Sequence, residues 1–202
     1  MTQRPDQTGP KPRRDAAATR SAIFEAATRR FAYQGYQCAG VREIASEAGV
    51  DAAMVNRYFG SKEKLFAEVI ERAFDIRDLI DGDRSSLAER LARRMVYGRE
   101  DTEDESPIPL LLMLRSATEP HAAELIRPCL DRNLLQPLAE CLDGPNPEVR
   151  AAMIIAQCTG FAILNQMLRP RALAEAQQEE LATLLKQSLT AYIGRVRQDR
   201  RG

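Results

Sequence analysis

Apolar residues recur at helical spacing along most of this 202-residue chain, and glycine or proline interrupts the pattern at intervals. Ala, Leu, Arg and Glu dominate, whereas aromatic residues make up only 5% of the chain. The β-branched and aromatic enrichment typical of strands is therefore missing. Because the chain is long enough for one or two compact cores, we expect an all-α protein of about nine helices.

The first third of the chain predicts four helices, over 15–35, 41–48, 51–60 and 61–79. The second and third have about two turns each, and Gly49 lets the chain reverse between them. This is the helix-turn-helix arrangement, although a generic corner of two helices has the same spacing. Residues that can begin or end these helices are Asp15, Gly35, Gly40, Gly49, Asp51, Gly60 and Ser61. Further helices are predicted over 87–97, 109–118, 121–141, 147–168 and 173–198.

Equal numbers of basic and acidic residues, 29 of each, conceal an asymmetry along the chain. Residues 1–66 hold 11 Lys+Arg and 7 Asp+Glu, whereas residues 67–202 hold 18 and 22. A basic end joined to an acidic remainder suggests that the basic end meets a polyanion. Ordinary solvated surface charge is the other interpretation.

The usual signatures of an enzyme, a metal site or a membrane protein are missing. His121 is the only histidine, the four cysteines form no CxxC pair, and no GxSxG, HExxH or P-loop pattern occurs. No apolar run approaches the roughly 18 residues of a membrane span, and no signal-peptide core precedes residue 20. We expect no enzymatic activity, no cofactor, no metal and no membrane partner, and a cytoplasmic location.

The helix predicted over 147–168 is apolar almost all round and has to be covered on both sides. Ala152, Ala156 and Gly160 recur every four residues, so another helix backbone can come close along that edge. We expect this helix and the last one to pair with their copies in a two-fold four-helix bundle, unless both faces are core of one chain. The predicted dimer interface is Val149, Ala152, Met153, Ala156, Gly160, Ile163, Leu185, Leu189, Tyr192 and Val196.

Four motifs follow one another in register: FAYQGY at 31–36, VREIA at 41–45, AGV at 48–50 and YFGSKEKLF at 58–66. Together they resemble the N-terminal domain of TetR-family transcriptional repressors. The resemblance implies a homodimer that binds a pseudo-palindromic operator in double-stranded DNA and leaves it when a small-molecule effector enters the C-terminal domain. In chain order we expect a disordered basic arm (1–14), a helix-turn-helix DNA-binding domain (15–60), a connecting helix (61–80) and a helical ligand-binding and dimerisation domain (81–202).

A short recognition helix capped by Asp51 can enter the major groove of DNA, where its outward positions face base edges or phosphates. Asn pairs with adenine and Arg with guanine, so Asn56 and Arg57 are candidates for sequence readout, unless they only solvate the helix. Arg42 and Lys62 lie at the starts of helices, where a phosphate is favoured. The predicted DNA contacts are Gly40, Arg42, Ala52, Ala53, Asn56, Arg57, Tyr58 and Lys62.

Two positions depart from the family pattern. The family usually has Thr at the position of Gly40, where the hydroxyl caps the next helix and touches a phosphate, and Tyr is common at the position of Asn56. Glycine keeps the cap conformation but loses the phosphate contact. At these two positions we do not expect the DNA contacts to copy those of the family's better-known members.

An effector pocket is expected among the helices between 87 and 168. Its predicted lining is Leu91, Met95, Leu111, Leu114, Cys158, Phe161 and Ala162, which favours a largely apolar molecule. Ordinary core packing is the other interpretation of each of these residues. An alternative function is a thiol-based redox-sensing regulator that uses Cys38 or Cys158, for which a reactive thiolate needs a basic environment.

Overall fold

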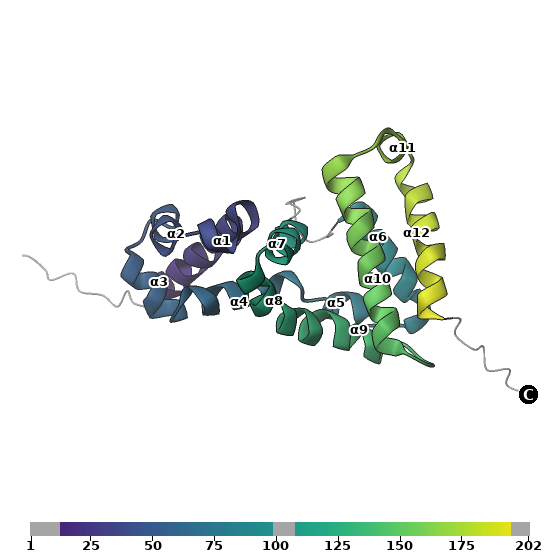
Figure 1. Cartoon of the computed structure of the whole chain (residues 1–202), viewed down its shortest axis with the longest axis horizontal. Helices are drawn as coiled ribbons and strands as arrows, with labels where there is room; N and C mark the ends of the chain where they lie inside the picture. The colour runs from purple at the N-terminus through teal and green to yellow at the C-terminus, as the bar shows by residue number, and fades with distance from the viewer. Residues whose placement is uncertain (1–12, 99–107, 195–202) are drawn as a thin grey trace, which may run out of the picture. The chain divides into compact units, whose positions relative to one another are not determined.

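The computed structural model of the protein describes residues 13–98 and 108–194, with side chains from residue 16 onward. Every regular element in these residues is helical, which confirms the all-α prediction (Figure 1). The chain divides into two compact units, residues 1–69 and 70–202, and the boundary falls inside one helix. Apart from residues 13 and 14, which are helical, the predicted basic arm lies outside the described residues.

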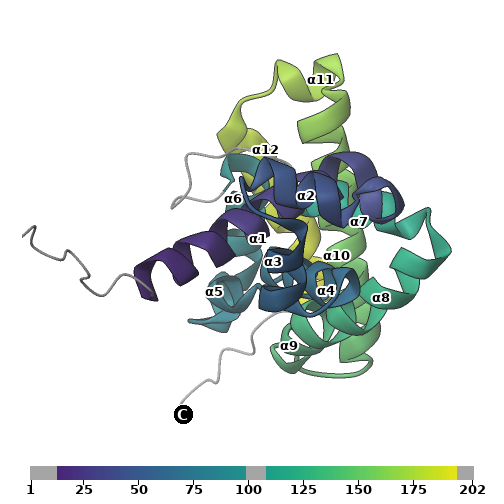
Figure 2. The same cartoon turned by 90° about the vertical axis from the view of Figure 1, so that its left-hand side faces the viewer.

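The first unit is a cluster of short helices around aromatic rings. Its elements are α1 (Arg13–Cys38), α2 (Val41–Glu47), α3 (Ala52–Phe59) and the first part of α4 (Lys62–Ala73). These helices lie together in both views (Figures 1 and 2). Phe31 meets Phe66 edge-to-face with ring centroids 5.0 Å apart, and Tyr36 lies 4.9 Å from Phe66. The rings of α1 and α4 thereby form a centre against which α2 and α3 can pack.

The caps predicted for the helix-turn-helix are present. The side chain of Asp51 accepts a hydrogen bond at 2.9 Å from the backbone N–H of Ala53, and so begins α3. Gly49, which ends α2, has a φ of 68°, a conformation that L side chains rarely adopt. The Ser61 hydroxyl accepts at 3.2 Å from the backbone N–H of Lys64 and begins α4. Local signals therefore fix the turns of this unit.

The first helix differs from the prediction at both ends. It begins at Arg13, two residues before the predicted cap Asp15. Gly35 interrupts it as expected, with a φ of 81°, but the helical turn then resumes and continues to Cys38. The predicted break is therefore correct, and the chain uses it as a kink.

The second unit contains the remaining helices. They are α5 (Arg77–Ile80), η1 (Arg84–Ser86), α6 (Leu87–Tyr97), α7 (Ile108–Ala117), α8 (Pro120–Leu130), η2 (Asp131–Leu135), α9 (Gln136–Glu140), α10 (Pro147–Ala162), η3 (Ile163–Leu168), α11 (Arg171–Ala174) and α12 (Gln178–Ile193). If α8–η2–α9 and α10–η3 are each taken as one helix and the single turns are left out, the described residues contain nine helices. Its fully buried side chains include Leu112, Leu138, Ile154 and Leu189.

Two segments, η2 and η3, have the wider π-helical turn. In the first case the sequence offers a reason. Pro137 has no N–H to donate, and its ring would clash with the carbonyl group of Asn133 in a regular α-helix. A π-helical turn just before it spaces the carbonyl groups differently.

Two predicted helices are broken. The helix expected over 61–79 ends at Ala73 because Asp75 bonds the following turn instead, with its carboxylate accepting from both the backbone N–H and the Nε of Arg77. The helix expected over 173–198 is divided into α11 and α12. Leu173 and Ala176 pack on a cluster that contains Leu181, so burial on both sides of the break favours a turn there. The end of this prediction lies beyond the described residues.

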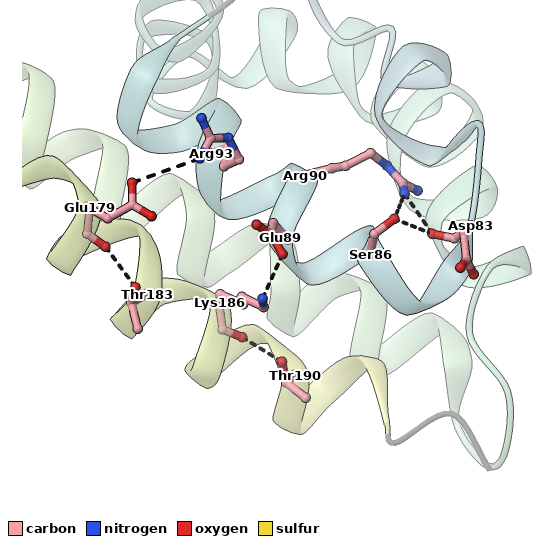
Figure 3. A network of polar contacts seen from close by, with 9 residues as sticks. All are labelled: Asp83, Ser86, Glu89, Arg90, Arg93, Glu179, Thr183, Lys186 and Thr190. Carbon is pink, nitrogen blue, oxygen red and sulfur yellow. Dashed lines mark hydrogen bonds and ion pairs between the residues drawn. The ribbon is translucent and has the colours of Figure 1, made fainter. Parts of the chain in front are cut away.

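Charged pairs join α12 to α6, which lies beside it in the second unit (Figure 3). Lys186 on α12 donates to Glu89 on α6 at 2.7 Å, and this bond holds the pKa of the Glu89 carboxyl below its usual range. One turn further along α6, and about two turns nearer the start of α12, Arg93 lies 4.0 Å from Glu179. These pairs fix which face of α12 turns inward toward α6.

Candidate nucleic-acid interface

The recognition helix α3 presents a buried face and an exposed face. Val55 and Phe59 are buried one turn apart, whereas Ala53, Asn56 and Arg57 are exposed. Phe59 is the last residue of the helix, and Gly60 follows it with a φ of 82°. Polar side chains that can reach DNA bases therefore share the outward face of a short, capped helix.

Lys62, the first residue of α4, is held next to the end of α1. Its Nζ lies 4.5 Å from the centroid of the Tyr36 ring and 3.4 Å from the carbonyl oxygen of Gln37. The Tyr36 hydroxyl in turn donates to Glu63 at 3.1 Å. Lys62 lies in the first turn of α4, whose positive end favours an anion, and its ammonium group is directed toward the C-terminal end of α1.

Gly40 caps α2 from an extended conformation, with φ −77° and ψ 149°. A Cβ built on this residue would lie 1.9 Å from Oε2 of Glu43. The Glu43 carboxylate therefore occupies the place where a larger side chain at residue 40 would begin. Its negative charge also stands close to the start of α2, where a DNA phosphate would otherwise be favoured.

The predicted DNA contacts all fall in the first unit, at the starts of α2 and α4 and along α3. Arg42, Ala53, Asn56 and Arg57 are exposed, and the others, Gly40, Ala52, Tyr58 and Lys62, are half-buried. Arg42 and Arg57 make no ion pair or side-chain hydrogen bond with the described part of the chain. Both guanidinium groups are therefore available to an external acceptor.

Sequence reasoning missed that other arginines of this basic unit bind carboxylates within it. Arg29 and Arg30, neighbours on α1, donate through Nε to the same carboxylate of Glu47 at 2.8 and 2.5 Å. The hydrogen bond from Arg29, followed by that from Arg30, holds the pKa of Glu47 below its usual range despite the opposing effect of burial. The positive excess of the sequence is therefore partly structural.

The predicted effector lining lies in the second unit, partly within its core. Leu91, Cys158 and Ala162 are buried, and Met95, Leu111, Leu114 and Phe161 are half-buried. None of these seven lines the apolar hollow of about 460 Å³ that opens between α7, η2 and α10. That hollow is lined by Met113, Leu130, Leu134, Leu135, Ala152, Ile155, Ala156, Thr159, Gly160 and Ile163.

The predicted dimer residues divide by helix. On α10, Val149, Ala152, Met153 and Ala156 are exposed and Gly160 is half-buried, as is Ile163, the first residue of η3. On α12, Leu185 and Leu189 are buried inside their own chain, because this face packs toward α6, and so they are not available to a partner. Tyr192 is half-buried, and Val196 lies outside the described residues. Leu184, which the prediction omitted, is 55% exposed.

The cysteines differ in accessibility. Cys38 is exposed, whereas burial raises the pKa of the Cys158 thiol to about 12, which opposes formation of a reactive thiolate there. Within the described residues, no three His, Cys, Asp or Glu side chains gather as a metal site would require.

The helix formed by α10 and η3 corrects one sequence expectation. Its 22 residues from Pro147 to Leu168 are long and apolar enough, by length and composition, to cross a membrane. A search for uninterrupted apolar runs misses this segment, because polar residues such as Gln157 and Asn165 interrupt it. The mean hydropathy of the segment nevertheless stays high enough for a membrane span. One face of the segment, with Ala151, Ile154, Cys158 and Ala162, is buried in the second unit.

An all-α chain with a capped, outward-facing recognition helix and a separate helical unit is a helix-turn-helix protein. Two family models match it: "Bacterial regulatory proteins, tetR family" over residues 23–69 and "Tetracyclin repressor-like, C-terminal domain" over residues 85–193. The chain therefore belongs to the TetR family of transcriptional regulators, which confirms the resemblance.

Curated relatives are similar over about a third of this chain. The HTH-type transcriptional repressor SCO4008 of Streptomyces coelicolor is 42% identical over 59 residues, which are 29% of this chain and 31% of the relative. The HTH-type transcriptional activator FasR of Mycolicibacterium smegmatis is 37% identical over 68 residues, 34% of this chain and 30% of the relative. The chain thus matches less than a third of the length of either protein.

Solved structures share the fold of the whole chain. The TetR-family regulator SCO0857 of Streptomyces coelicolor has a TM-score of 0.61 and 24% identity, covering 92% of this chain and 99% of its own. NalD of Pseudomonas aeruginosa, a secondary repressor of the MexAB-OprM multidrug efflux pump, has a TM-score of 0.63 and 22% identity, covering 90% and 99%. These likenesses establish the architecture of both units.

Proposed function

We propose that this protein is a ligand-responsive transcriptional repressor that binds a palindromic operator as a homodimer. The observation that carries the proposal is α3, a capped helix whose exposed Asn56 and Arg57 are directed away from a buried Val55–Phe59 face. A helix of this kind can enter the major groove and read base edges. Such a protein acts where the DNA is, in the cytoplasm.

Each predicted contact has a different part in DNA binding. Asn56 and Arg57 read bases, because an amide pairs bidentately with adenine and a guanidinium with guanine. Arg42 and Lys62 neutralise phosphates at the starts of α2 and α4, and the Tyr58 hydroxyl is a further phosphate donor. Ala52 and Ala53 are small enough for α3 to approach the groove closely. Phosphate contacts position the unit, and base contacts specify the sequence.

The dimer is supported by apolar side chains that one chain leaves uncovered. Val149 is 63% exposed and Leu168 is 68% exposed, and Met153, Leu164 and Met167 lie on the same continuous helix. Ala152 and Ala156 give this helix an edge along which a second helix can pack closely. We infer that α10 and η3, with Leu184 of α12, face a second copy about a two-fold axis. Two helix-turn-helix domains related by a two-fold axis explain a palindromic operator, because each domain binds one half of the sequence.

The effector is a largely apolar small molecule in the hollow between α7, η2 and α10. Its walls are aliphatic apart from the Thr159 hydroxyl and the Met113 sulfur, and its volume is in the range of small-ligand sites. Ala152, Ala156, Gly160 and Ile163 belong to both the hollow and the proposed dimer face. A ligand in the hollow therefore acts on the helix that sets the distance between the two helix-turn-helix domains of the proposed dimer.

The sign of regulation is proposed from two relatives whose printed names are repressors, one similar in sequence and the other in fold. FasR, named an activator, is the competing precedent. In vitro transcription from a promoter that carries the bound sequence distinguishes the two: a repressor lowers transcript yield, and an activator raises it.

One experiment tests the core of the proposal. Duplexes with a random central segment are incubated with the full-length protein, and bound molecules are separated, amplified and sequenced over several rounds. We expect an inverted-repeat sequence, bound by a dimer in sedimentation analysis, with affinity that falls steeply as salt rises because phosphate contacts release counterions. Enrichment of no sequence, or binding that is independent of salt, would contradict the proposal.

A further inference from the structure

One arginine of α1, Arg20, touches two other helices of the first unit. Its Nη2 donates to both carboxylate oxygens of Glu68 on α4, at 2.6 and 2.7 Å. Its guanidinium carbon also lies 4.6 Å from the centroid of the Phe59 ring on α3. Arg20 therefore connects α1, α3 and α4 through a single planar group, which suits guanidinium chemistry because its edge donates while its face stacks.

The contact with α3 lies at the end of the recognition helix. Phe59 is its last residue and is only 7% exposed, so the position of its ring fixes where the helix ends. At the other end, the α3 backbone is fixed by the cap on Asp51. Stacking by Arg20 thus holds the C-terminal end of the helix that presents Asn56 and Arg57.

The contact with α4 lies next to the boundary between the two units. Glu68 precedes Val69, the last residue of the first unit, and α4 continues without a break to Ala73 in the second. The same helix begins at Lys62, one of the proposed phosphate contacts. A rotation or displacement of α4 therefore acts directly on Glu68 and, through the ion pair, on Arg20.

We propose that Arg20 is a positioning residue for DNA reading, which ties the end of the recognition helix to α4 through Glu68 and Phe59. This inference rests on the proposed DNA-binding function. It assigns no DNA contact to Arg20, whose Nη2 already donates to a carboxylate of the chain. Breaking the Arg20–Glu68 pair leaves the end of α3 less restricted and reduces base readout more than phosphate binding.

Electrostatics alone and positioning predict opposite results for one substitution. Glu68→Gln removes a negative charge from a DNA-binding unit, so electrostatics alone predicts tighter binding to every duplex. Positioning instead predicts weaker binding to the preferred sequence. Glu25→Gln is the matched control: this exposed glutamate of α1 accepts a hydrogen bond from Ser21 at 2.9 Å and makes no ion pair or hydrogen bond with the described residues of α3 or α4.

The experiment compares affinities for two duplexes, the one selected by the unaltered full-length protein and a scrambled duplex of the same composition. For Glu68→Gln we expect the ratio of the two affinities to fall by about two- to fivefold, the range that one partly exposed ion pair can supply. For Glu25→Gln the ratio should stay unchanged. Arg20→Gln, which also removes the stacking, should lower the ratio at least as much.

Thermal unfolding of each variant separates positioning from loss of structure. A merely structural role lowers the unfolding temperature and the active fraction but leaves the ratio of affinities unchanged. If Glu68→Gln and Glu25→Gln give the same ratio, the positioning proposal is wrong. If the unaltered protein does not discriminate between the two duplexes, DNA reading itself is wrong, so the two failures are distinguishable. Should Arg20→Gln fail to fold, Glu68→Gln still decides.

Discussion

The two units of this chain differ in what they leave open. In the first unit, aromatic rings fill the centre and arginines of α1 bind carboxylates of α2 and α4, while Arg42 and Arg57 keep no partner within the described residues. In the second, charged pairs close α12 against α6, but one side of α10 presents bare aliphatic groups. The first unit thus exposes positive charges that its own carboxylates do not neutralise, and the second exposes apolar side chains that its own helices do not cover. This difference indicates two different kinds of partner.

The largest expected effect comes from a charge in the open apolar side of α10. Met153, 44% exposed, replaced by Asp should weaken self-association by about a hundredfold or more, because an unpaired charge in a covered interface costs several kcal/mol. Affinity for the operator should fall together with self-association, since one helix-turn-helix domain makes only half of the DNA contacts. Sedimentation and mobility-shift titrations measure both.

Gln136→Asp on the exposed surface of α9 is the control for this substitution, because it adds the same charge to a side chain that is already solvated. It should leave the association constant unchanged. A Met153→Asp protein that still sediments as a dimer would show that the open side of α10 is not the contact between copies.

The next largest effect is expected at an exposed arginine of the first unit. Arg57→Ala should lower affinity for the selected duplex by about ten- to a hundredfold and relax the preference at one base position, the usual worth of a bidentate base contact. Because Arg57 is exposed, the unfolding temperature should hardly change. A variant with full sequence preference would mean that Arg57 only solvates the helix.

Lys62→Ala should behave differently. Loss of a phosphate contact should weaken binding to selected and scrambled duplexes alike and reduce the slope of log affinity against log salt by about one. Titrations at four salt concentrations measure the slope. An unchanged slope, together with a drop confined to the selected duplex, would assign Lys62 to base reading.

A substitution at Gly40 is expected to increase the affinity for DNA. Gly40→Thr should raise affinity roughly two- to tenfold, the worth of one added hydrogen bond, once the flexible Glu43 carboxylate turns aside. The extended backbone of Gly40 accepts a side chain without strain. Gly40→Ala, which adds the Cβ without the hydroxyl, separates the displacement of Glu43 from the new contact. Equal gains for both variants would assign the effect to Glu43 alone.

The smallest effect concerns stability and pH. The lowered pKa of Glu47 means that its bonds to Arg29 and Arg30 stabilise the fold above the ordinary carboxyl value of 4.5 and lose this contribution as pH falls through the lowered value. Glu47→Gln should therefore lower the free energy of unfolding by about 1 kcal/mol or less at pH 7 and by less in acid. Denaturant titrations at pH 7 and pH 3.5 measure the difference.

Local signals were sufficient to predict the first unit. Glycine at the turns and the cap at Asp51 act over a few residues, so these helices and their turns could be located from spacing, whereas the helix-turn-helix was told from a generic corner by its four motifs. The partners of its arginines could not be found in this way, because Arg20 and Glu68 are 48 residues apart in the sequence. Charge counting therefore overestimated what is left for DNA.

The second unit was predicted less well for a different reason. A helix that is apolar on two sides does not indicate which side its own chain covers, and for α12 the structure buries Leu185 and Leu189, which were expected to face a partner. The predicted effector lining stays a prediction: Leu91 and Cys158 are buried, and ordinary core packing has the same composition as an apolar pocket wall. Only the arrangement of neighbouring helices decides such cases.

The two π-helical turns border the same hollow, with Leu134 and Leu135 from η2 and Ile163 from η3. When a π turn relaxes to an α turn, the helix beyond it rotates by about 100°, one residue's share of a turn. A helix that lines the hollow can in this way replace one aliphatic side chain by the neighbouring one without being unwound. We therefore expect the width of the hollow to be adjustable in steps, so that the proposed effector site can take apolar molecules of different shape.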